Sequence, residues 1–387
     1  MKILFYCCEF APEGRTGAIR PSKLAKYFDA SGHDVYIIKK KPENESYRDL
    51  EDPIMHLDRT SVKLRKFFPI NDDGFWFSFL SVFELYRKVR KVKPDFIFIS
   101  IPVFLPLITT YIISKLTNTK YVVDYRDLWF GDPYEAKSLK DKVLRSIGSI
   151  VEPRIMKNAS LVNFISEEMK NDQEKLFGSI KNSCVISTGF DDSDLKRGGR
   201  NLDSIFNGSF RYYAHIGMLD WDMNVLELIN LVNKFKERLS ENVKIVFVGG
   251  KNNLIIDAFK KYGLSQVCLF VDTVDKVTAI EIAKKSNGLI VLGSDSPQRL
   301  NRKIFESIAC NSNIFYFGNK DSPTARVLKE CNHNLILDKT VPIEVIESKF
   351  IHFIESSNER GALPKPLFKY KKSFLAKRYL TELERLL

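Results

Sequence analysis

Short apolar runs alternate with amphipathic segments along the chain. In the first half, apolar runs typical of buried strands lie at 2–7, 35–38, 95–100, 120–124, 160–165 and 183–187. After the first run, Leu24, Ala25 and Phe28 recur at helical spacing, and we expect Pro21 at the start of that helix because proline is favoured there. Apolar strands that alternate with helices predict a parallel sheet with helices on both faces.

A polar, glycine-containing segment at 191–208 interrupts this pattern, which then restarts. Further strands are expected at 210–216, 243–248, 267–271, 288–293 and 313–317, again with helices between them. The predicted fold class is α/β, with two Rossmann-like doubly wound parallel-sheet domains in tandem. The predicted parts are a first domain at 1–190, a linker at 191–208, a second domain at 209–365 and a C-terminal helix at 366–387 that packs back on the first domain.

The composition is that of a globular protein. Of the 387 residues, 44% are hydrophobic and 28% are charged, which excludes a disordered chain or a fibre. The six cysteines lack zinc-site spacing, so we expect a reduced cytoplasmic protein without a metal site. No signal peptide is expected, because the strand at 2–7 runs directly into a loop. The uncharged stretch from Phe96 to Ser114 contains Pro102 and Pro106, which favours a strand and a buried helix over a transmembrane span.

Half of the net charge of +12 lies at 59–93, which contains nine Lys or Arg, three acidic residues and seven Phe or Trp. Cations beside aromatic side chains are typical of a surface that binds anionic membranes or, less often, nucleic acid. The alternative is a solvated charged face over an aromatic core. We expect contact with an anionic membrane surface through 59–93, and no nucleic-acid partner.

Ligands of open parallel sheets bind at the carboxyl ends of the strands, so we expect the site in the cleft between the domains. Gly17 lies in a loop of small residues after the first strand, where backbone amides can approach a phosphate or make a plain tight turn. His215 and Gly217 end the first strand of the second domain, and His215 is either a core residue or a ligand. Asp220 and Asp222 follow, and Asp222 is better explained as a helix N-cap than as a metal ligand.

Two further pairs of charged residues follow predicted strands. Lys303 and Glu306 lie one helical turn apart, where they can bind an anion and a ribose or form an exposed ion pair. Arg126 and Asp127 follow a strand of the first domain, where they can orient a sugar and stabilise developing charge or form a structural ion pair.

Several segments together, in this order, resemble the retaining GT-B glycosyltransferases known as glycosyl transferases group 1, over nearly the whole chain. The segments are Arg20-Pro21-x-x-Leu24-Ala25-Lys26-Tyr27, Gly32-His33-Asp34-Val35, Tyr125-Arg126-Asp127-Leu128-Trp129, Ile186-Ser187-Thr188-Gly189-Phe190-Asp191, His215-Ile216-Gly217, Val246-Phe247-Val248-Gly249 and Lys303-Ile304-Phe305-Glu306. The Arg126-Asp127-Leu128-Trp129 segment resembles that of enzymes of exopolysaccharide, capsule and O-antigen assembly.

This resemblance implies an acceptor-side first domain and a nucleotide-sugar donor domain. The enzyme would transfer a sugar, with retention, from a nucleotide diphosphate sugar to a lipid-linked glycan. It would need no cofactor or metal, and it would work peripherally at the inner face of the plasma membrane.

The resemblance also assigns roles to individual residues. Glu306 would hold the donor ribose and Lys303 would lie near the diphosphate. Gly17 and Gly217 would make room for the donor. The other assigned positions are Arg20, Gly249 and Arg299 for donor binding, and Arg126, Asp127 and His215 for catalysis.

Two departures from the family pattern leave other functions open. Gln298 stands where the family often has its first Glu, and Asp220, Trp221 and Asp222 occupy the place of an Arg and a Lys that clamp the diphosphate. The negative charge of the diphosphate would then have to be neutralised by Lys303, Arg299, Arg302 or Lys251. The alternatives are a sugar-nucleotide 2-epimerase, which would need ionisable residues around the sugar, and a non-catalytic GT-B-like partner subunit.

Overall fold

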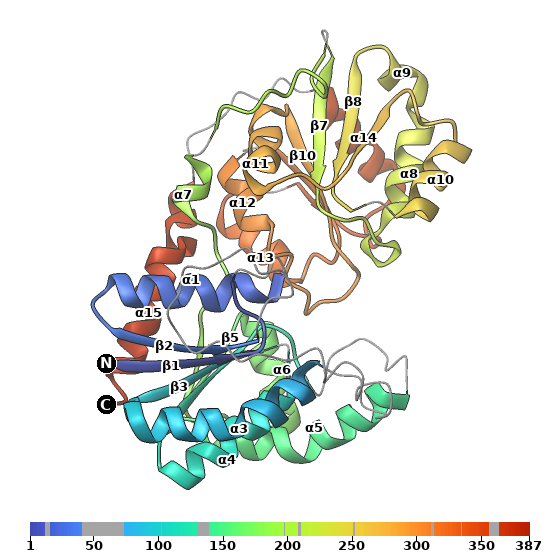
Figure 1. The fold of residues 1–387 in the computed structure, drawn as a ribbon. Helices are drawn as coiled ribbons and strands as arrows, with labels where there is room; N and C mark the ends of the chain where they lie inside the picture. The colour runs from blue at the N-terminus through green and yellow to red at the C-terminus, as the bar shows by residue number, and fades with distance from the viewer. Residues whose placement is uncertain are drawn as a thin grey trace, which may run out of the picture. The chain divides into compact units, whose positions relative to one another are not determined.

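The chain forms two compact units in a computed structural model (Figure 1), which describes residues 1–11, 16–40, 73–101, 103–129, 139–196, 198–207, 210–250, 252–310, 313–333, 335–355 and 364–387. Unit 1 contains Met1–Thr188 and Leu375–Leu387, and unit 2 contains Gly189–Phe374. The segment at 191–208, expected as a linker, is part of unit 2, where Leu202 is buried in the core.

Unit 1 is built on a six-stranded parallel sheet in the order β2-β1-β3-β4-β5-β6. The strands are β1 (Lys2–Cys7), β2 (Asp34–Lys39), β3 (Phe96–Ile101), β4 (Lys120–Tyr125), β5 (Leu161–Phe164) and β6 (Ser183–Val185). Strands β3 and β5 are buried along their whole length because helices cover both faces of the sheet. The predicted strand positions are confirmed.

Two layers of helices enclose this sheet (Figure 1). The helices are α1 (Thr16–Ala30), α3 (Asp73–Val92), α4 (Leu105–Thr117), α5 (Leu139–Asn158), α6 (Glu167–Phe177) and α15 (Lys372–Glu384). On one face, Phe28 of α1 and Tyr379 of α15 pack on Phe98 of β3. On the other face, Tyr6 of β1 stacks on Phe77 of α3.

Helix α1 begins earlier than predicted. It starts at Thr16, so Pro21 lies inside the helix and not at its start, as we had expected. Proline removes one backbone hydrogen bond at this point, to the carbonyl of Gly17. The helix nevertheless continues to Ala30, because Leu24, Ala25 and Phe28 pack on the sheet.

Unit 2 repeats the architecture around a second six-stranded parallel sheet, in the order β12-β11-β10-β7-β8-β9. Its strands are β7 (Arg211–Ile216), β8 (Val243–Val248), β9 (Cys268–Val271), β10 (Gly288–Leu292), β11 (Ile314–Phe317) and β12 (Ile336–Leu337). With two such sheets, the predicted fold class is confirmed.

Successive side chains of these strands point to opposite faces of the sheet and pack in two separate hydrophobic cores. Tyr213 faces the core formed with α8 (Val225–Lys234), α10 (Asn253–Lys261) and α14 (Ile343–Glu355). Tyr212 faces the core formed with α11 (Lys276–Lys285), α12 (Ile304–Cys310) and α13 (Pro323–Glu330). The short helices are α7 (Asp192–Leu195), α9 (Lys236–Ser240), η1 (Trp221–Met223) and η2 (Lys365–Tyr370).

Within the ranges that the structure describes, none of the helices has both the length and the apolar character needed to cross a bilayer. The stretch from Phe96 to Ser114 forms β3 and most of α4, as the sequence predicts.

Candidate functional site

Two glycines meet at the carboxyl ends of β7 and β8 in unit 2. Gly217 donates its amide hydrogen to the carbonyl oxygen of Val248, at 2.7 Å. Gly249 has a φ of +156°, and a Cβ there would lie 2.3 Å from the carbonyl oxygen of Gly217. Only glycine fits at this position, because any side chain would collide with the neighbouring backbone. The backbones of β7 and β8 therefore approach closely at this point, where neither glycine carries a side chain.

Lys303 and His215 approach Gly217 from the neighbouring segments. A Cβ on Gly217 would lie 3.3 Å from Nζ of Lys303 and 3.6 Å from Nε2 of His215. Lys303 directly precedes α12, and His215 lies on β7. The structure therefore brings three of the predicted residues together, with Gly249 beside them.

The ring of His215 is held in one orientation. It is buried, and its Nδ1 lies 3.0 Å from the carbonyl oxygen of Ile290. A carbonyl oxygen can only accept, so Nδ1 carries the proton and Nε2 is left as an acceptor. Among the described residues, Nε2 of His215 has no hydrogen-bond partner. Burial lowers the pKa of His215 to about 4, and the nearby Lys303 ammonium acts in the same direction.

We expect this histidine to make unfolding depend on pH. The pKa of His215 is about 4 in the folded protein and near 6.5 in an unfolded chain. As the pH falls from 7 to 4, the unfolded chain binds a proton that the folded protein excludes, so the free energy of unfolding falls by up to about 3 kcal/mol. Denaturant unfolding of His215→Gln at a series of pH values should remove that part of the dependence.

The matched control is His352→Gln, on the exposed side of α14. It should keep the pH dependence of the unmodified protein. Parallel pH profiles for the unmodified protein and His215→Gln would contradict the assignment of a neutral buried ring.

Glu306 is held by a lysine that the sequence did not single out. Oε1 of Glu306 lies 2.6 Å from Nζ of Lys276, which also lies 2.7 Å from Oδ2 of Asp194. Burial opposes the charge on Lys276, but the two carboxylates outweigh it and raise the pKa of this lysine. Glu306 is therefore fixed between α11 and α12, and a ribose would bind a carboxylate that Lys276 already orients.

The acidic residues after Gly217 have structural partners. Asp220 accepts a hydrogen bond from the amide of Trp221, and Asp222 forms an ion pair with Arg299. Asp222 is not a helix N-cap, as we had expected, because Asn224 precedes α8. The Arg299 guanidinium therefore reaches a diphosphate only if it leaves or shares this carboxylate. The described residues include no group of three or more potential metal ligands, and Lys251 lies outside the described residues.

In unit 1, Gly17 makes room for a protein carboxylate. A Cβ at Gly17 would lie 1.3 Å from Oε2 of Glu9 and 3.4 Å from Nη2 of Arg126. Arg126 is buried and donates from Nε to the carbonyl oxygen of Ile101, at 2.8 Å. Asp127 is exposed. The structure thus groups Glu9, Gly17 and Arg126 at the carboxyl ends of β1 and β4.

The side chain of Arg20 is buried in unit 1, where it pairs with Asp124. Its Nε and Nη2 donate to the two oxygens of Asp124, at 2.8 and 2.9 Å. Nη1 donates to the carbonyl oxygen of Ser187 and Nη2 to that of Ile186, at 2.6 and 2.8 Å. Burial opposes ionisation of Asp124, but Arg20 outweighs it and lowers the pKa of this carboxyl. These contacts explain the position and charge of the Arg20 side chain without a role in donor binding.

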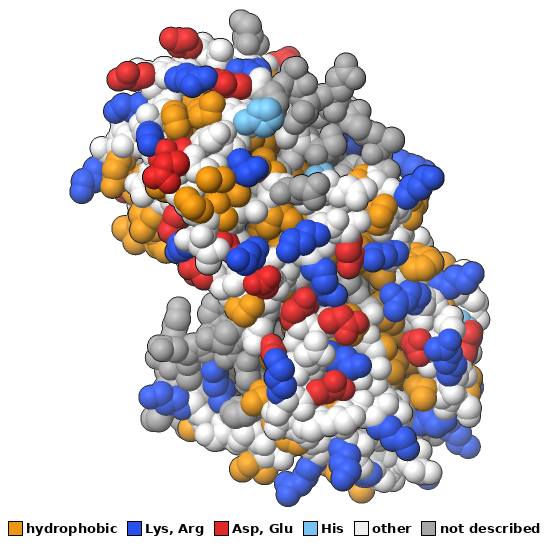
Figure 2. Space-filling view, turned by 180° about the vertical axis from the view of Figure 1, so that it is seen from behind, with side chains coloured by type: hydrophobic (Ala, Val, Ile, Leu, Met, Phe, Trp, Pro, Cys, Tyr) orange, Lys and Arg blue, Asp and Glu red, His pale blue; other side chains and the backbone are white. Residues whose placement is uncertain are grey.

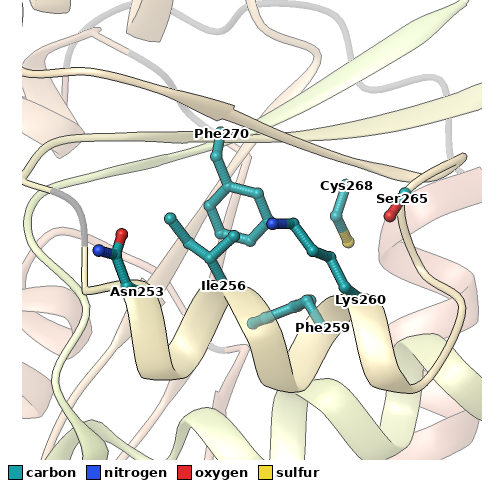
Figure 3. A pocket seen from close by; sticks show the side chains of 7 residues that line it. All are labelled: Asn253, Ile256, Phe259, Lys260, Ser265, Cys268 and Phe270. Atoms are coloured by element: carbon teal, nitrogen blue, oxygen red, sulfur yellow. The ribbon is translucent and has the colours of Figure 1, made fainter.

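The surface of unit 2 is hollowed beside the two glycines. A cavity of about 410 Å³ lies between α10 and the edge strand β9, lined by Asn253, Ile256, Phe259, Lys260, Ser265, Cys268 and Phe270 (Figure 3). A smaller hollow is lined by Gly217 and Gly249 and shares Ile256 and Phe270 with it. The larger cavity has a mostly apolar lining and contains none of the residues predicted to bind the donor.

Glu9, Asp124 and Lys276 were missed by the sequence analysis. Glu9 had a usable signal, because it follows the first strand at the edge of the sheet where ligands bind. Nothing in the sequence pairs Lys276 with Glu306 or Asp124 with Arg20, because these contacts join segments far apart in the chain.

Two Rossmann-like units with parallel six-stranded sheets define the GT-B fold, and solved structures of that fold match the whole chain. Sucrose-phosphate synthase from Thermosynechococcus elongatus matches with a TM-score of 0.72 and 14% identity, over 100% of this chain and 98% of that one. HepE from Anabaena, solved with UDP and glucose, matches with a TM-score of 0.65 and 13% identity, over 100% of both chains. The lipopolysaccharide outer core galactosyltransferase WaaB matches with a TM-score of 0.65 and 10% identity, over 100% of both chains.

Residues 22–194, which cover most of unit 1, match the family model described as Glycosyltransferase Family 4. This match and the fold support a GT-B glycosyltransferase. The fold also occurs in a UDP-N-acetylglucosamine 2-epimerase from Listeria monocytogenes, described as putative, with a TM-score of 0.63 and 10% identity over 99% of this chain and 95% of that one. No curated protein matches the sequence.

Proposed function

We propose that this protein is a retaining glycosyltransferase that uses a nucleotide diphosphate sugar. The observation that carries the proposal is the group formed by Gly217, Lys303 and His215 at the end of β7. The ammonium of Lys303 is suited to a diphosphate, and Nε2 of His215 can accept a hydrogen bond from a sugar hydroxyl. Gly217 leaves room for both parts of the ligand. The Glycosyltransferase Family 4 match and the UDP and glucose bound to HepE support the same class of donor.

In the proposed reaction, one residue stabilises the charge of the leaving diphosphate and another positions the sugar. Lys303 would neutralise charge that grows on the diphosphate as the bond from its oxygen to the anomeric carbon breaks. Nε2 of His215 would accept a hydrogen bond from a sugar hydroxyl and fix the sugar over Gly217. The acceptor oxygen then bonds to the anomeric carbon, and its proton passes to the departing diphosphate. Retention is proposed from the resemblance to retaining GT-B glycosyltransferases, and it requires the acceptor oxygen to attack the face of the sugar from which the diphosphate leaves. Glu306 and Asp222 are both held in ion pairs and are poorly placed to attack as nucleophiles, so the proposed step has no covalent sugar–enzyme intermediate.

The proposed acceptor is a lipid-linked glycan of cell-surface polysaccharide synthesis, met at the cytoplasmic face of the membrane. Two observations support it. The Arg126-Asp127-Leu128-Trp129 segment resembles that of enzymes of such pathways, and WaaB, which has the same fold, acts on lipopolysaccharide outer core by its name. In unit 1, Arg126 and Glu9 provide a cation and a carboxylate at the edge of the sheet, which suits an acceptor rich in hydroxyl groups.

A 2-epimerase is the second candidate, because the Listeria protein has the same fold. Epimerisation at C2 moves a proton, so it needs residues that can act as acid and base beside the sugar. In unit 2, the ring of His215 is buried with a low pKa and Glu306 is bound to Lys276. These features favour transfer over epimerisation.

Incubation with a panel of UDP-, GDP- and dTDP-sugars tests the proposal. We expect slow hydrolysis of one donor, with a released sugar whose initial anomeric configuration by NMR matches that of the donor. Turnover should persist in EDTA, because protein cations and backbone amides are expected to stabilise the leaving diphosphate. An epimerised nucleotide sugar would establish the second candidate, and neither turnover nor binding would establish a non-catalytic subunit. Activity lost in EDTA and restored by Mn²⁺ would assign Asp220 and Asp222 as metal ligands.

A further inference from the structure

Helix α3 presents large apolar side chains to solvent, directly opposite its buried side. Phe77, Ser81 and Leu85 face the sheet and are buried. Phe79 and Phe83 are 64% and 66% exposed, and they lie half a turn away from those residues. An outward aromatic stripe on a helix whose other side already packs in a core is typical of a surface that binds a partner.

The same arrangement recurs on α4, which packs beside α3, and on α5, which packs beside α4 (Figure 1). On α4, Ile112 and Leu116 are exposed one turn apart. On α5, Val143, Ile147 and Ile150 are exposed at helical spacing, while Ile155 faces the sheet. We call the exposed apolar residues of these three helices the outer face, which consists of Phe79, Val82, Phe83, Tyr86, Ile112, Leu116, Val143, Ile147 and Ile150.

Cations surround the outer face. Figure 2, which views the molecule from behind the view of Figure 1, shows Lys and Arg side chains beside hydrophobic side chains along the lower edge of the molecule. The guanidinium of Arg87 lies 5.6 Å from the centre of the Phe83 ring. The other exposed cations on or beside these helices include Arg90, Lys91, Lys93, Lys115, Lys142, Arg154 and Lys157. On α5, the carboxylate of Glu152 is buried and does not reach this surface.

We infer that the outer face docks on an anionic lipid bilayer. Aromatic and aliphatic side chains would enter the interface, and the cations beside them would meet lipid phosphates. A second copy of the chain is a poorer partner, because pairing two such faces would bring like charges together. Of the segment predicted to touch the membrane, Trp76 and Phe77 are buried, and residues 59–72 lie outside the described residues. The inference extends the proposed function, since docking would bring the enzyme to a lipid-linked acceptor.

Co-sedimentation with vesicles tests this inference without donor or acceptor, so its result is independent of the proposed activity. We expect binding to equal parts phosphatidylglycerol and phosphatidylcholine at low salt, and at least roughly tenfold weaker binding to phosphatidylcholine alone. Phe79→Ser/Phe83→Ser should lower the partition coefficient roughly tenfold or more. The matched control is Leu226→Ser/Leu254→Ser, which removes two exposed apolar residues from unit 2 and should leave binding unchanged.

Charge-reversal variants measure the electrostatic contribution to vesicle binding separately from the apolar contribution. Arg87→Glu/Arg90→Glu/Lys91→Glu should weaken binding at least roughly tenfold, whereas Lys236→Glu/Lys260→Glu/Lys261→Glu on unit 2 should weaken it far less. Lys88 is left in place because its ammonium lies 5.3 Å from the Tyr36 ring within the fold. Equal loss in outer-face and control variants, or no binding by the unmodified protein, would overturn the inference. So would a sedimentation coefficient that falls in the Phe79→Ser/Phe83→Ser protein without lipid, since a second copy would then occupy this face.

Discussion

Replacing Arg20 by methionine should lower the free energy of unfolding by about 3–5 kcal/mol, the largest effect on stability that we expect from one substitution. Asp124 is fully buried, and Arg20 is its cationic partner at 2.8 Å. Removal of one partner of a buried ion pair leaves an uncompensated charge in the core. Here it also leaves the carbonyl oxygens of Ile186 and Ser187 without the hydrogen bonds that Arg20 donates.

Urea unfolding, followed by circular dichroism, measures this effect. The matched control is Arg385→Met, which removes an exposed guanidinium paired with Glu382 on α15 and should cost less than about 1 kcal/mol. The double variant Arg20→Met/Asp124→Asn should recover part of the loss, because no unpaired charge remains and the amide oxygen can still accept a hydrogen bond from Ser100 or Asn163. A stable Arg20→Met protein that has lost donor affinity would instead assign Arg20 to donor binding.

The largest effect on function is expected at Glu306. Glu306→Gln should weaken donor binding roughly 10- to 150-fold, because each hydrogen bond from a ribose hydroxyl to a carboxylate contributes about 1.5–3 kcal/mol. Isothermal titration calorimetry with the nucleoside diphosphate of the preferred donor measures this change. The matched control is Glu330→Gln, which removes a carboxylate paired with Lys369 elsewhere in unit 2 and should leave donor affinity unchanged.

Lys276→Met distinguishes the two roles that the carboxylate of Glu306 can have. If Glu306 binds ribose, loss of Lys276 should weaken donor binding less than loss of Glu306 itself, because the carboxylate remains on α12. If Glu306 is only the structural partner of Lys276, both variants should keep full donor affinity and lose stability. Unchanged affinity in a folded Glu306→Gln protein would contradict the ribose role.

The architecture was accessible from the sequence because both sheets are covered on both sides. Strands such as β3 and β10 are buried at every position, so they stand out as continuous apolar runs between amphipathic segments. Element starts were less predictable. Pro21 suggested a helix start, but the packing of Leu24 and Phe28 outweighs the single hydrogen bond that proline removes.

The sequence anticipated which residues lie together where they are close in the chain, and it missed contacts that depend on a distant partner. His215 and Gly217 are neighbours on one strand end, and the structure places Lys303 over them. The family resemblance assigned Arg20 to donor binding, but Arg20 forms a buried ion pair with Asp124, which is far away in the chain. The Glu9 carboxylate likewise occupies the space beside Gly17, and no local sequence pattern predicts this contact.

Helix α15 has a consequence for how the protein is made. Residues 375–387 belong to unit 1, although the whole of unit 2 separates them from the rest of it in the sequence. Tyr379 and Leu383 are fully buried in the core of unit 1. During synthesis the ribosome therefore completes unit 2 before it supplies these side chains. Until then the apolar surface of α1 and β3 that they cover is open to water, and it is a natural binding site for a chaperone.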